Sequence, residues 1–160
     1  MMKSVIFGVA LAALATPMVG IAATPAAPAK VVVDLTTGDL PKLKARLLEA
    51  LPKLKAHYAN KGKALDAVVV VHGEAYRFFL KDLEGTPYAS EAGLREAQAD
   101  LHKRIDALRA EGVRFEVCSV GMGRLGLKPE QLQPGVGVAA SAVIALIDWQ
   151  NAGYAYVPVH

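Results

Sequence analysis

Short runs of β-branched residues alternate with longer amphipathic segments along most of the chain, and this alternation limits the possible folds more than any other feature. Residues 30–35 (KVVVDL) and 66–71 (DAVVVV) are continuous apolar runs, which are typical of strands buried on both faces. Residues 113–118 (VRFEVC) predict a third strand, and residues 136–138 and 154–157 predict two shorter ones. Because strands that alternate with helices favour parallel pairing, we expect an α/β fold, a three-layer α/β/α sandwich with a mostly parallel sheet of about five strands.

The segments between the strands carry helical patterns. Apolar residues recur at spacings of three and four over residues 40–58 and over residues 94–108, which predicts two amphipathic helices. Asp39 and Ser90 precede these segments and are suitable N-caps. Pro52 lies inside the first pattern and is expected to kink or divide that helix.

The last predicted helix differs from the others because it is apolar on more than one side. It follows Ser141 and has the sequence AVIALIDWQ over residues 142–150. A helix of this kind is either fully buried or partly covered by another subunit. The second alternative predicts a homo-oligomer.

The N-terminus has the features of a secretory signal peptide. Lys3 precedes a short apolar run at residues 5–14, and small residues follow at the end of residues 1–23, which we interpret as the signal peptide. The run is too short to anchor the chain in a bilayer, and no Cys lies near the cleavage site to carry a lipid. We therefore expect a periplasmic protein without a stable membrane anchor, with a disordered tether at 24–29 and one domain at 30–160.

Charge composition argues against nucleic-acid binding. The 160 residues include 18 Lys and Arg and 15 Asp and Glu, which alternate along the chain without forming a basic block. Binding by counterion release needs a patch of many cations, so we expect no nucleic-acid partner. No two His or Cys residues have the spacing of metal ligands, and we expect no metal site.

Cys118 is the only cysteine, so the chain has no internal disulfide. It ends a predicted parallel strand, and ligands bind at that end of the strands in open α/β sheets. The glycine-rich residues 121–126 and the cation Arg124 follow, and their N–H groups and charge would lower the pKa of the thiol. These features predict a reactive thiolate, although a buried and inert cysteine at the end of a strand explains the same pattern.

His72 ends the second predicted strand and should lie on the same rim as Cys118. It is a candidate proton acceptor for the thiol. The alternative is a His that caps the first turn of the helix predicted at 74–83. Tyr76, near the same rim, is expected on the helix surface first and in the site second. Residues 121–126 also match the pattern G-x-G-x-x-G, but the long helix and acidic residue of a dinucleotide site are missing, so a flexible turn beside the thiol is favoured.

Four segments together resemble the DsrE/DsrF-like sulfur-relay family. They are VVVDLTTGD, VVVVHGEAYRFFL, GVRFEVCSVGM and SAVIALIDWQNAGYAYVPV, which span residues 31–159. The resemblance implies a Rossmann-like three-layer fold, assembly into homo- or hetero-oligomers, and a cysteine that accepts sulfur as a persulfide and passes it on. That role falls on Cys118, and His72 with Gly73 matches a pocket-lining position.

The expected function is therefore periplasmic sulfur trafficking, with Cys118 as the persulfide carrier in a sulfurtransferase-like reaction. The turn residues Ser119, Gly121 and Gly123 and the strand-end Gly73 are expected to surround the donated sulfur, which needs no organic cofactor. A sulfur donor or acceptor protein is an expected partner. This chain differs from the better-studied members of the family in one respect. They work in the cytoplasm, whereas this chain begins with a predicted export signal. The alternatives are a non-catalytic oligomeric binding or scaffold module and a small anion- or nucleotide-binding domain.

Overall fold

The computed structural model describes residues 26–160. The predicted signal peptide at 1–23 and the first part of the predicted tether lie outside the described residues. Residues 26–28 have no regular secondary structure, and the first strand begins at Ala29, one residue inside the range predicted as a tether.

The centre of the molecule is one sheet in which all neighbouring strands are parallel. Its strands are β1 (Ala29–Leu35), β2 (Leu65–Val71), β3 (Arg114–Cys118), β4 (Gly137–Ala139) and β5 (Ala155–Val159). They lie in the order β4-β3-β2-β1-β5. The predicted parallel sheet of about five strands is thus confirmed.

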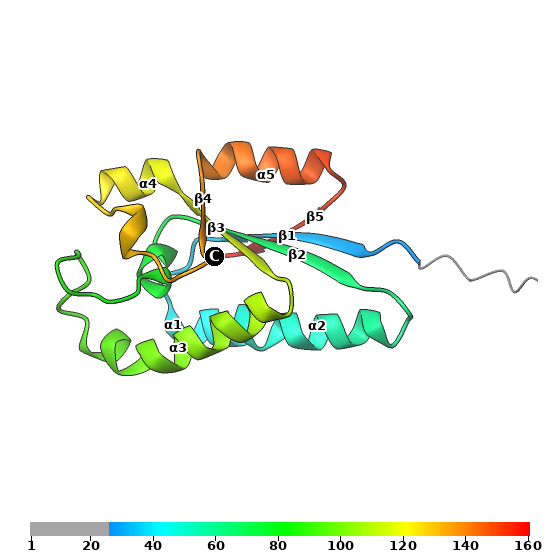
Figure 1. The fold of residues 1–160 in the computed structure, drawn as a ribbon, viewed down its shortest axis with the longest axis horizontal. Helices are drawn as coiled ribbons and strands as arrows, with labels where there is room; N and C mark the ends of the chain where they lie inside the picture. Colours follow the sequence, from blue (N-terminus) through cyan, green and yellow to red (C-terminus); the bar gives the residue numbers. More distant parts are fainter. Residues whose placement is uncertain (1–25) are drawn as a thin grey trace, which may run out of the picture.

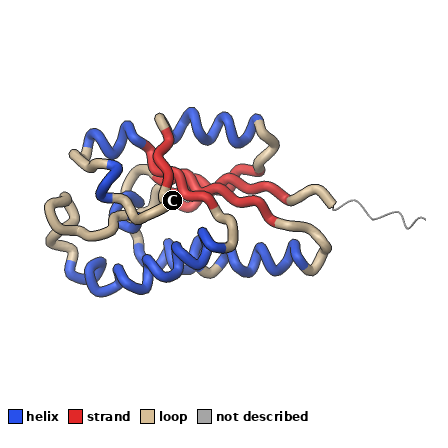
Figure 2. The backbone as a smooth tube through the Cα atoms, in the orientation of Figure 1, coloured by secondary structure: helices blue, strands red, loops and turns tan. Residues whose placement is uncertain are grey.

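Helices cover both faces of the sheet and complete the predicted three-layer sandwich (Figure 1; Figure 2). On one face lie α1 (Leu40–Leu43), α2 (Ala50–Ala59) and α3 (Ala92–Ala110), and on the other lie α4 (Ser119–Arg124) and α5 (Ala142–Asn151). The strand interiors are apolar because helices cover both sides of them, and the valines of β2 are completely buried.

The first helical region is divided, as the proline predicts, but one turn earlier than expected. The Asp39 carboxylate accepts a hydrogen bond from the N–H of Lys42 at 2.8 Å and caps α1. A π-helical turn over Lys44–Leu48 separates α1 from α2. Because Pro52 has no N–H to donate, the carbonyl of residue 48 has no regular helical partner, and the ladder changes register in the turn before the proline.

The segment at 74–83, predicted as a helix, forms only a short 3-10 helix over Ala75–Phe79. The loop that precedes β4 competes for its backbone groups. The N–H of Lys81 donates to the carbonyl of Gln131 and the N–H of Gln133 donates to the carbonyl of Phe79. These bonds hold the chain extended from Leu80 onward and end the helix.

The helices α3 and α5 begin without a side-chain capping hydrogen bond. Glu91, not Ser90, occupies the cap position of α3, and its side chain makes no capping hydrogen bond. Ser141 does occupy the cap position of α5, also without a side-chain cap bond.

Three of the large apolar residues of α5 face outward. Ala142 and Ala145 pack on the sheet, while Val143, Ile144 and Ile147 are each more than half exposed. The expectation of a fully buried helix is therefore wrong, which leaves the alternative of a face covered by another subunit. Within residues 26–160, no helix has the length and apolar character needed to cross a bilayer.

Candidate functional site

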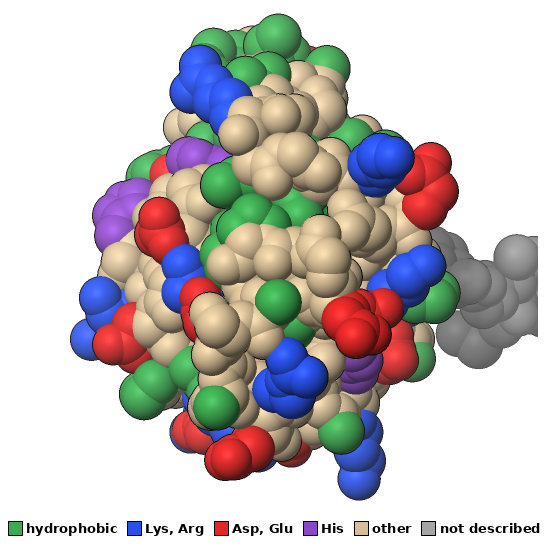
Figure 3. Space-filling view, turned by 90° about the vertical axis from the view of Figure 1, so that its left-hand side faces the viewer, with side chains coloured by type: hydrophobic (Ala, Val, Ile, Leu, Met, Phe, Trp, Pro, Cys, Tyr) green, Lys and Arg blue, Asp and Glu red, His purple; other side chains and the backbone are tan. Residues whose placement is uncertain are grey.

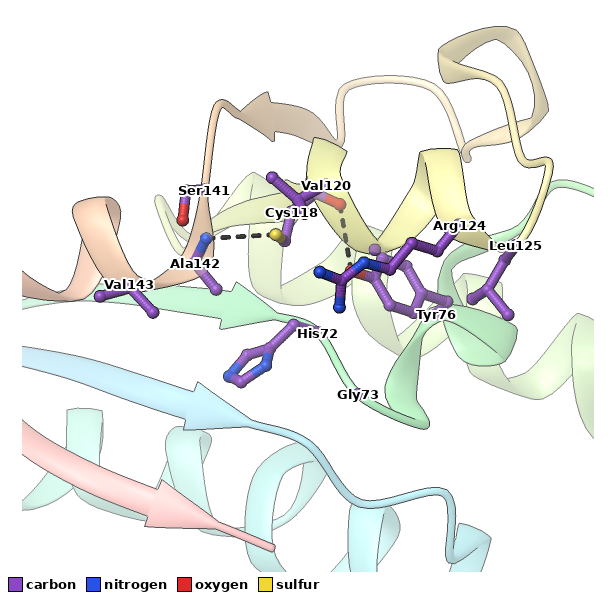
Figure 4. A pocket seen from close by; sticks show the side chains of 11 residues that line it. His72, Gly73, Tyr76, Cys118, Val120, Arg124, Leu125, Ser141, Ala142 and Val143 are labelled. Atoms are coloured by element: carbon purple, nitrogen blue, oxygen red, sulfur yellow. Dashed lines mark hydrogen bonds between the residues drawn. The ribbon is translucent and has the colours of Figure 1, made fainter.

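Cys118 is held between the starts of two helices. It is the last residue of β3, and α4 begins at the next residue. The neighbouring strand β4 ends on the same rim, and α5 begins three residues after it. The thiol is 6% exposed, and its Sγ accepts a hydrogen bond from the N–H of Ala142 at 3.2 Å (Figure 4).

The glycine-rich segment after Cys118 is a helix, and the prediction of a flexible turn is wrong. Residues Ser119–Arg124 form α4, and the N–H groups of Val120 and Gly121 at its start lower the pKa of the thiol. The first N–H groups of a helix have no partner within the helix, so they are free to bind the sulfur. The predicted stabilisation of the thiol by backbone N–H groups is therefore present, but it comes from helix starts.

Gly121 is needed for its missing side chain. Its φ is not positive, and a Cβ at this position would lie 1.9 Å from the hydroxyl oxygen of Tyr76. Tyr76 is almost completely buried, and its hydroxyl donates to the carbonyl of Cys118 at 3.1 Å. The first expectation for Tyr76, a helix surface, is wrong, because the 3-10 helix directs its ring under α4. Its second, a place in the site, agrees with the cavity that Tyr76 lines.

The hydrogen bonds around Sγ change the acidity of the thiol. Burial raises the pKa of Cys118, but the N–H groups of Gly121 and Ala142, the Tyr76 hydroxyl and the N–H of Val120 more than offset it, so the pKa lies below that of an ordinary thiol. Burial and the neighbouring thiolate charge raise the pKa of Tyr76, which keeps its hydroxyl protonated as a donor.

A cavity of about 480 Å³ opens at Cys118. Among the residues predicted for the site, His72, Gly73, Cys118, Gly121 and Arg124 line it. Figure 3 looks onto this rim, where apolar side chains show in the hollowed middle, histidine side chains lie to one side and a cationic side chain projects above. The rim of the parallel sheet thus gathers residues that are distant in sequence.

Other predicted site residues lie elsewhere. The hydroxyl of Ser119 donates to the carbonyl of Ala140 at 2.8 Å and joins α4 to the loop after β4. Gly123 is exposed, and nothing lies within 4 Å of a Cβ built on it. Neither residue lines the cavity.

His72 lines the cavity but turns its ring toward β1 and away from the sulfur (Figure 4). Its Nε2 lies 2.6 Å from Oδ1 of the buried Asp34, whose Oδ2 accepts a hydrogen bond from the hydroxyl of Tyr156 at 2.6 Å. The carbonyl of His72 accepts a bond from the N–H of Ala75 and so starts the following turn. The expected approach of the imidazole to Cys118 is replaced by a link between β2, β1 and β5.

Sequence reasoning missed the contribution of Ala142 and ranked Tyr76 as a helix-surface residue before a site residue. A signal for Ala142 was available, because Ser141 follows a predicted strand and therefore starts a helix at the same rim as Cys118. The position of Tyr76 near the rim was predicted, but the direction of its ring depends on the path of a short 3-10 helix. Within residues 26–160, no group of three or more His, Cys, Asp or Glu side chains is arranged to hold a metal ion.

Sequence comparison identifies relatives over nearly the whole described chain. The model of the DsrE/DsrF-like family matches residues 30–159. An uncharacterized protein of Aquifex aeolicus (strain VF5) is 28% identical over 133 residues, which cover 83% of this chain and 57% of that protein. The chain therefore spans little more than half the length of this relative.

Two solved structures are similar to this fold. A protein of unknown function from Methanobacterium thermoautotrophicum, MTH1491, superimposes with a TM-score of 0.64 at 22% identity, covering 81% of this chain and 98% of the other. The ychN protein from E. coli superimposes with a TM-score of 0.54 at 14% identity, with the same two coverages. At these identities the similarity concerns the fold alone.

Proposed function

The chain belongs to the DsrE/DsrF-like family, and from this premise we propose that it is a sulfur-trafficking protein of the periplasm. Cys118 accepts a sulfane sulfur as a persulfide and passes it to an acceptor. The observation that carries the proposal is the set of backbone N–H groups beside Sγ, which come from the starts of α5 and α4. Such donors are what a thiolate nucleophile requires near neutral pH.

The transfer consists of two displacement steps at sulfur. The Cys118 thiolate attacks the sulfane sulfur of the donor, a bond forms between the two sulfurs, and the donor's other group leaves with the electron pair. An acceptor thiolate then attacks the outer sulfur, and Cys118 leaves as a thiolate. Electrons balance within each step, so the exchange requires no external oxidant or reductant.

The surrounding residues have separate roles in this proposal. The N–H groups of Val120, Gly121 and Ala142 stabilise the negative sulfur before the attack and after the transfer. His72, the predicted proton acceptor, is engaged by Asp34 and turned away from Sγ (Figure 4), so the proposal gives it no part in the transfer. Burial of Sγ requires the donor to enter the cavity, which protects the persulfide from bulk solvent.

Export and assembly belong to the same proposal. The predicted signal peptide supports a periplasmic location, and N-terminal sequencing of protein from that fraction should begin near Ala23 or Thr24. An intact Met1 on cytoplasmic protein would contradict export.

The exposed apolar face of α5, formed by Val143, Ile144 and Ile147, supports a homo-oligomer.

The experiment that tests persulfide formation is intact-mass measurement after exposure to polysulfide. The wild-type chain should gain mass in steps of one sulfur atom, and a reductant should remove the gain. The Cys118→Ser variant, which cannot form the persulfide, should gain none. If the wild-type chain gains no mass, the proposal of a sulfur carrier fails and the alternative of a non-catalytic scaffold module replaces it.

A further inference from the structure

The cavity at Cys118 contains a cation without a protein partner. Elsewhere in the molecule, Arg77 pairs with Glu91 and Arg114 pairs with Asp66. Among the residues that the structure describes, the Arg124 side chain has no ion-pair partner and no hydrogen-bond partner. Figure 4 shows its guanidinium reaching from α4 into the space between the thiol and the side of the cavity formed by β2.

The rest of the described cavity wall supplies nothing to neutralise this cation. None of the lining residues is an Asp or a Glu. The nearby carboxylate of Asp34 is engaged by His72 and Tyr156 and does not line the cavity. An uncompensated guanidinium beside backbone N–H groups therefore gives the cavity a positive local potential.

The burial of the thiol limits which donors can reach it. Cys118 lines the cavity and is nearly fully buried. The walls at Val120, Leu125 and Val143 are apolar and offer few hydrogen-bonding groups to a large polar molecule. A donor that reaches the sulfur must be small, and its negative charge would be the feature that Arg124 recognises.

We infer that the sulfur donor is a small oxyanion in which the sulfane sulfur is bonded directly to an oxidised, negatively charged group, and that Arg124 selects it. This inference rests on the proposed persulfide function of Cys118. Arg124 binds the oxyanion, while Sγ faces the sulfane sulfur. With thiosulfate as the probe, the thiolate attacks the sulfane sulfur, a new S–S bond forms, the S–S bond of thiosulfate breaks, and sulfite leaves with the electron pair.

The charge preference of the cavity can be measured without any sulfur chemistry. Iodoacetate and iodoacetamide alkylate the same thiolate, but only iodoacetate is anionic. For each protein, the alkylation rate of Cys118 with iodoacetate is divided by the rate with iodoacetamide, and this ratio is normalised to that of a free thiol. We expect the normalised ratio to fall about three- to tenfold in Arg124→Gln. The ratio cancels any change in the thiolate fraction, because both reagents depend on it equally.

Lys128→Gln is the matched control. Lys128 is an exposed cation that follows α4 in the chain but does not line the cavity, and its replacement removes the same charge. We expect this variant to keep the wild-type ratio. Added salt at about 1 M, where the Debye length is about 3 Å, should reduce the wild-type preference for iodoacetate.

Loading with thiosulfate completes the test. Arg124→Gln should slow persulfide formation from thiosulfate by a factor similar to the fall in the alkylation ratio. If Arg124→Gln loads from thiosulfate and reacts with iodoacetate as wild type does, while polysulfide still loads Cys118, the donor inference alone fails. If neither donor adds sulfur to a thiol that alkylates freely, the proposed function itself fails.

Discussion

The N–H of Ala142 donates to Sγ of Cys118 at 3.2 Å, and this bond joins the end of β3 to the start of α5. The two residues are 24 positions apart in the chain. They meet because β3 and β4 are parallel neighbours, so the helices that follow both strands begin on one rim. The thiol therefore lies where two sets of free helix N–H groups converge.

This convergence predicts a thiol that reacts below the pH range of an ordinary cysteine. Burial raises the pKa of Cys118, the hydrogen bonds to Sγ lower it, and the net shift is downward. The rate of alkylation by iodoacetamide should therefore reach its plateau at a lower pH in the native protein than in the urea-unfolded chain. A native protein that resists alkylation until it unfolds would identify Cys118 as inert core.

Tyr76→Phe should raise the pKa of the Cys118 thiol. The variant removes the hydroxyl that donates to the carbonyl of Cys118 and lowers the pKa of its thiol, and it keeps the buried ring. The alkylation profile should move to higher pH relative to wild type. Tyr156→Phe is the control, since it removes a hydroxyl that bonds to Asp34 and should leave the profile in place. Equal profiles for all three proteins would show that the Tyr76 hydroxyl does not lower the pKa of the Cys118 thiol.

Gly121→Ala should destabilise the fold by about 1–3 kcal/mol, because its Cβ would overlap the buried Tyr76 hydroxyl. Gly123→Ala, two residues along α4, meets nothing within 4 Å and should be neutral or more stable by up to about 1 kcal/mol. Urea unfolding of the two variants measures the difference. Equal stabilities would contradict the close contact between Gly121 and Tyr76.

The prediction of a turn at residues 121–126 was wrong because local sequence alone does not determine the structure of this segment. Each Gly in a helix interior costs about 1 kcal/mol relative to Ala, so a segment with three glycines favours a turn. In the structure the helix forms because the segment is fixed at both ends, by β3 before it and by the buried Leu127 after it. The residue type at Gly121 follows from a contact with Tyr76, which no pattern near residue 121 encodes.

The general location of the site was predictable, and its hydrogen bonds were not. Strands that alternate with helices place His72 and Cys118 on one rim whatever the strand order, and both line the cavity. The direction of the His72 ring depends on the neighbouring strand. Because β1 lies beside β2, the imidazole meets the buried Asp34 and not the thiol.

The outward face of α5 predicts self-association. Val143, Ile144 and Ile147 form an exposed apolar strip, whereas Trp149 packs against Tyr154 and donates a hydrogen bond to Glu116. Light scattering of the mature protein should give a dimer or a larger species. The double variant Ile144→Glu, Ile147→Glu should shift it toward the monomer without unfolding, because both side chains are exposed. A monomeric wild-type protein at micromolar concentration would contradict a shared α5 interface.

The most direct test of the central claim is one complete cycle of sulfur uptake and release. The protein is loaded with polysulfide, separated from the donor by gel filtration, and treated with cyanide, which removes the outer sulfur of a persulfide as thiocyanate and leaves the Cys118 thiolate. We predict about one thiocyanate per wild-type chain, set by the single thiol. Release from wild type no greater than from Cys118→Ser would contradict the role of Cys118 as a sulfur carrier.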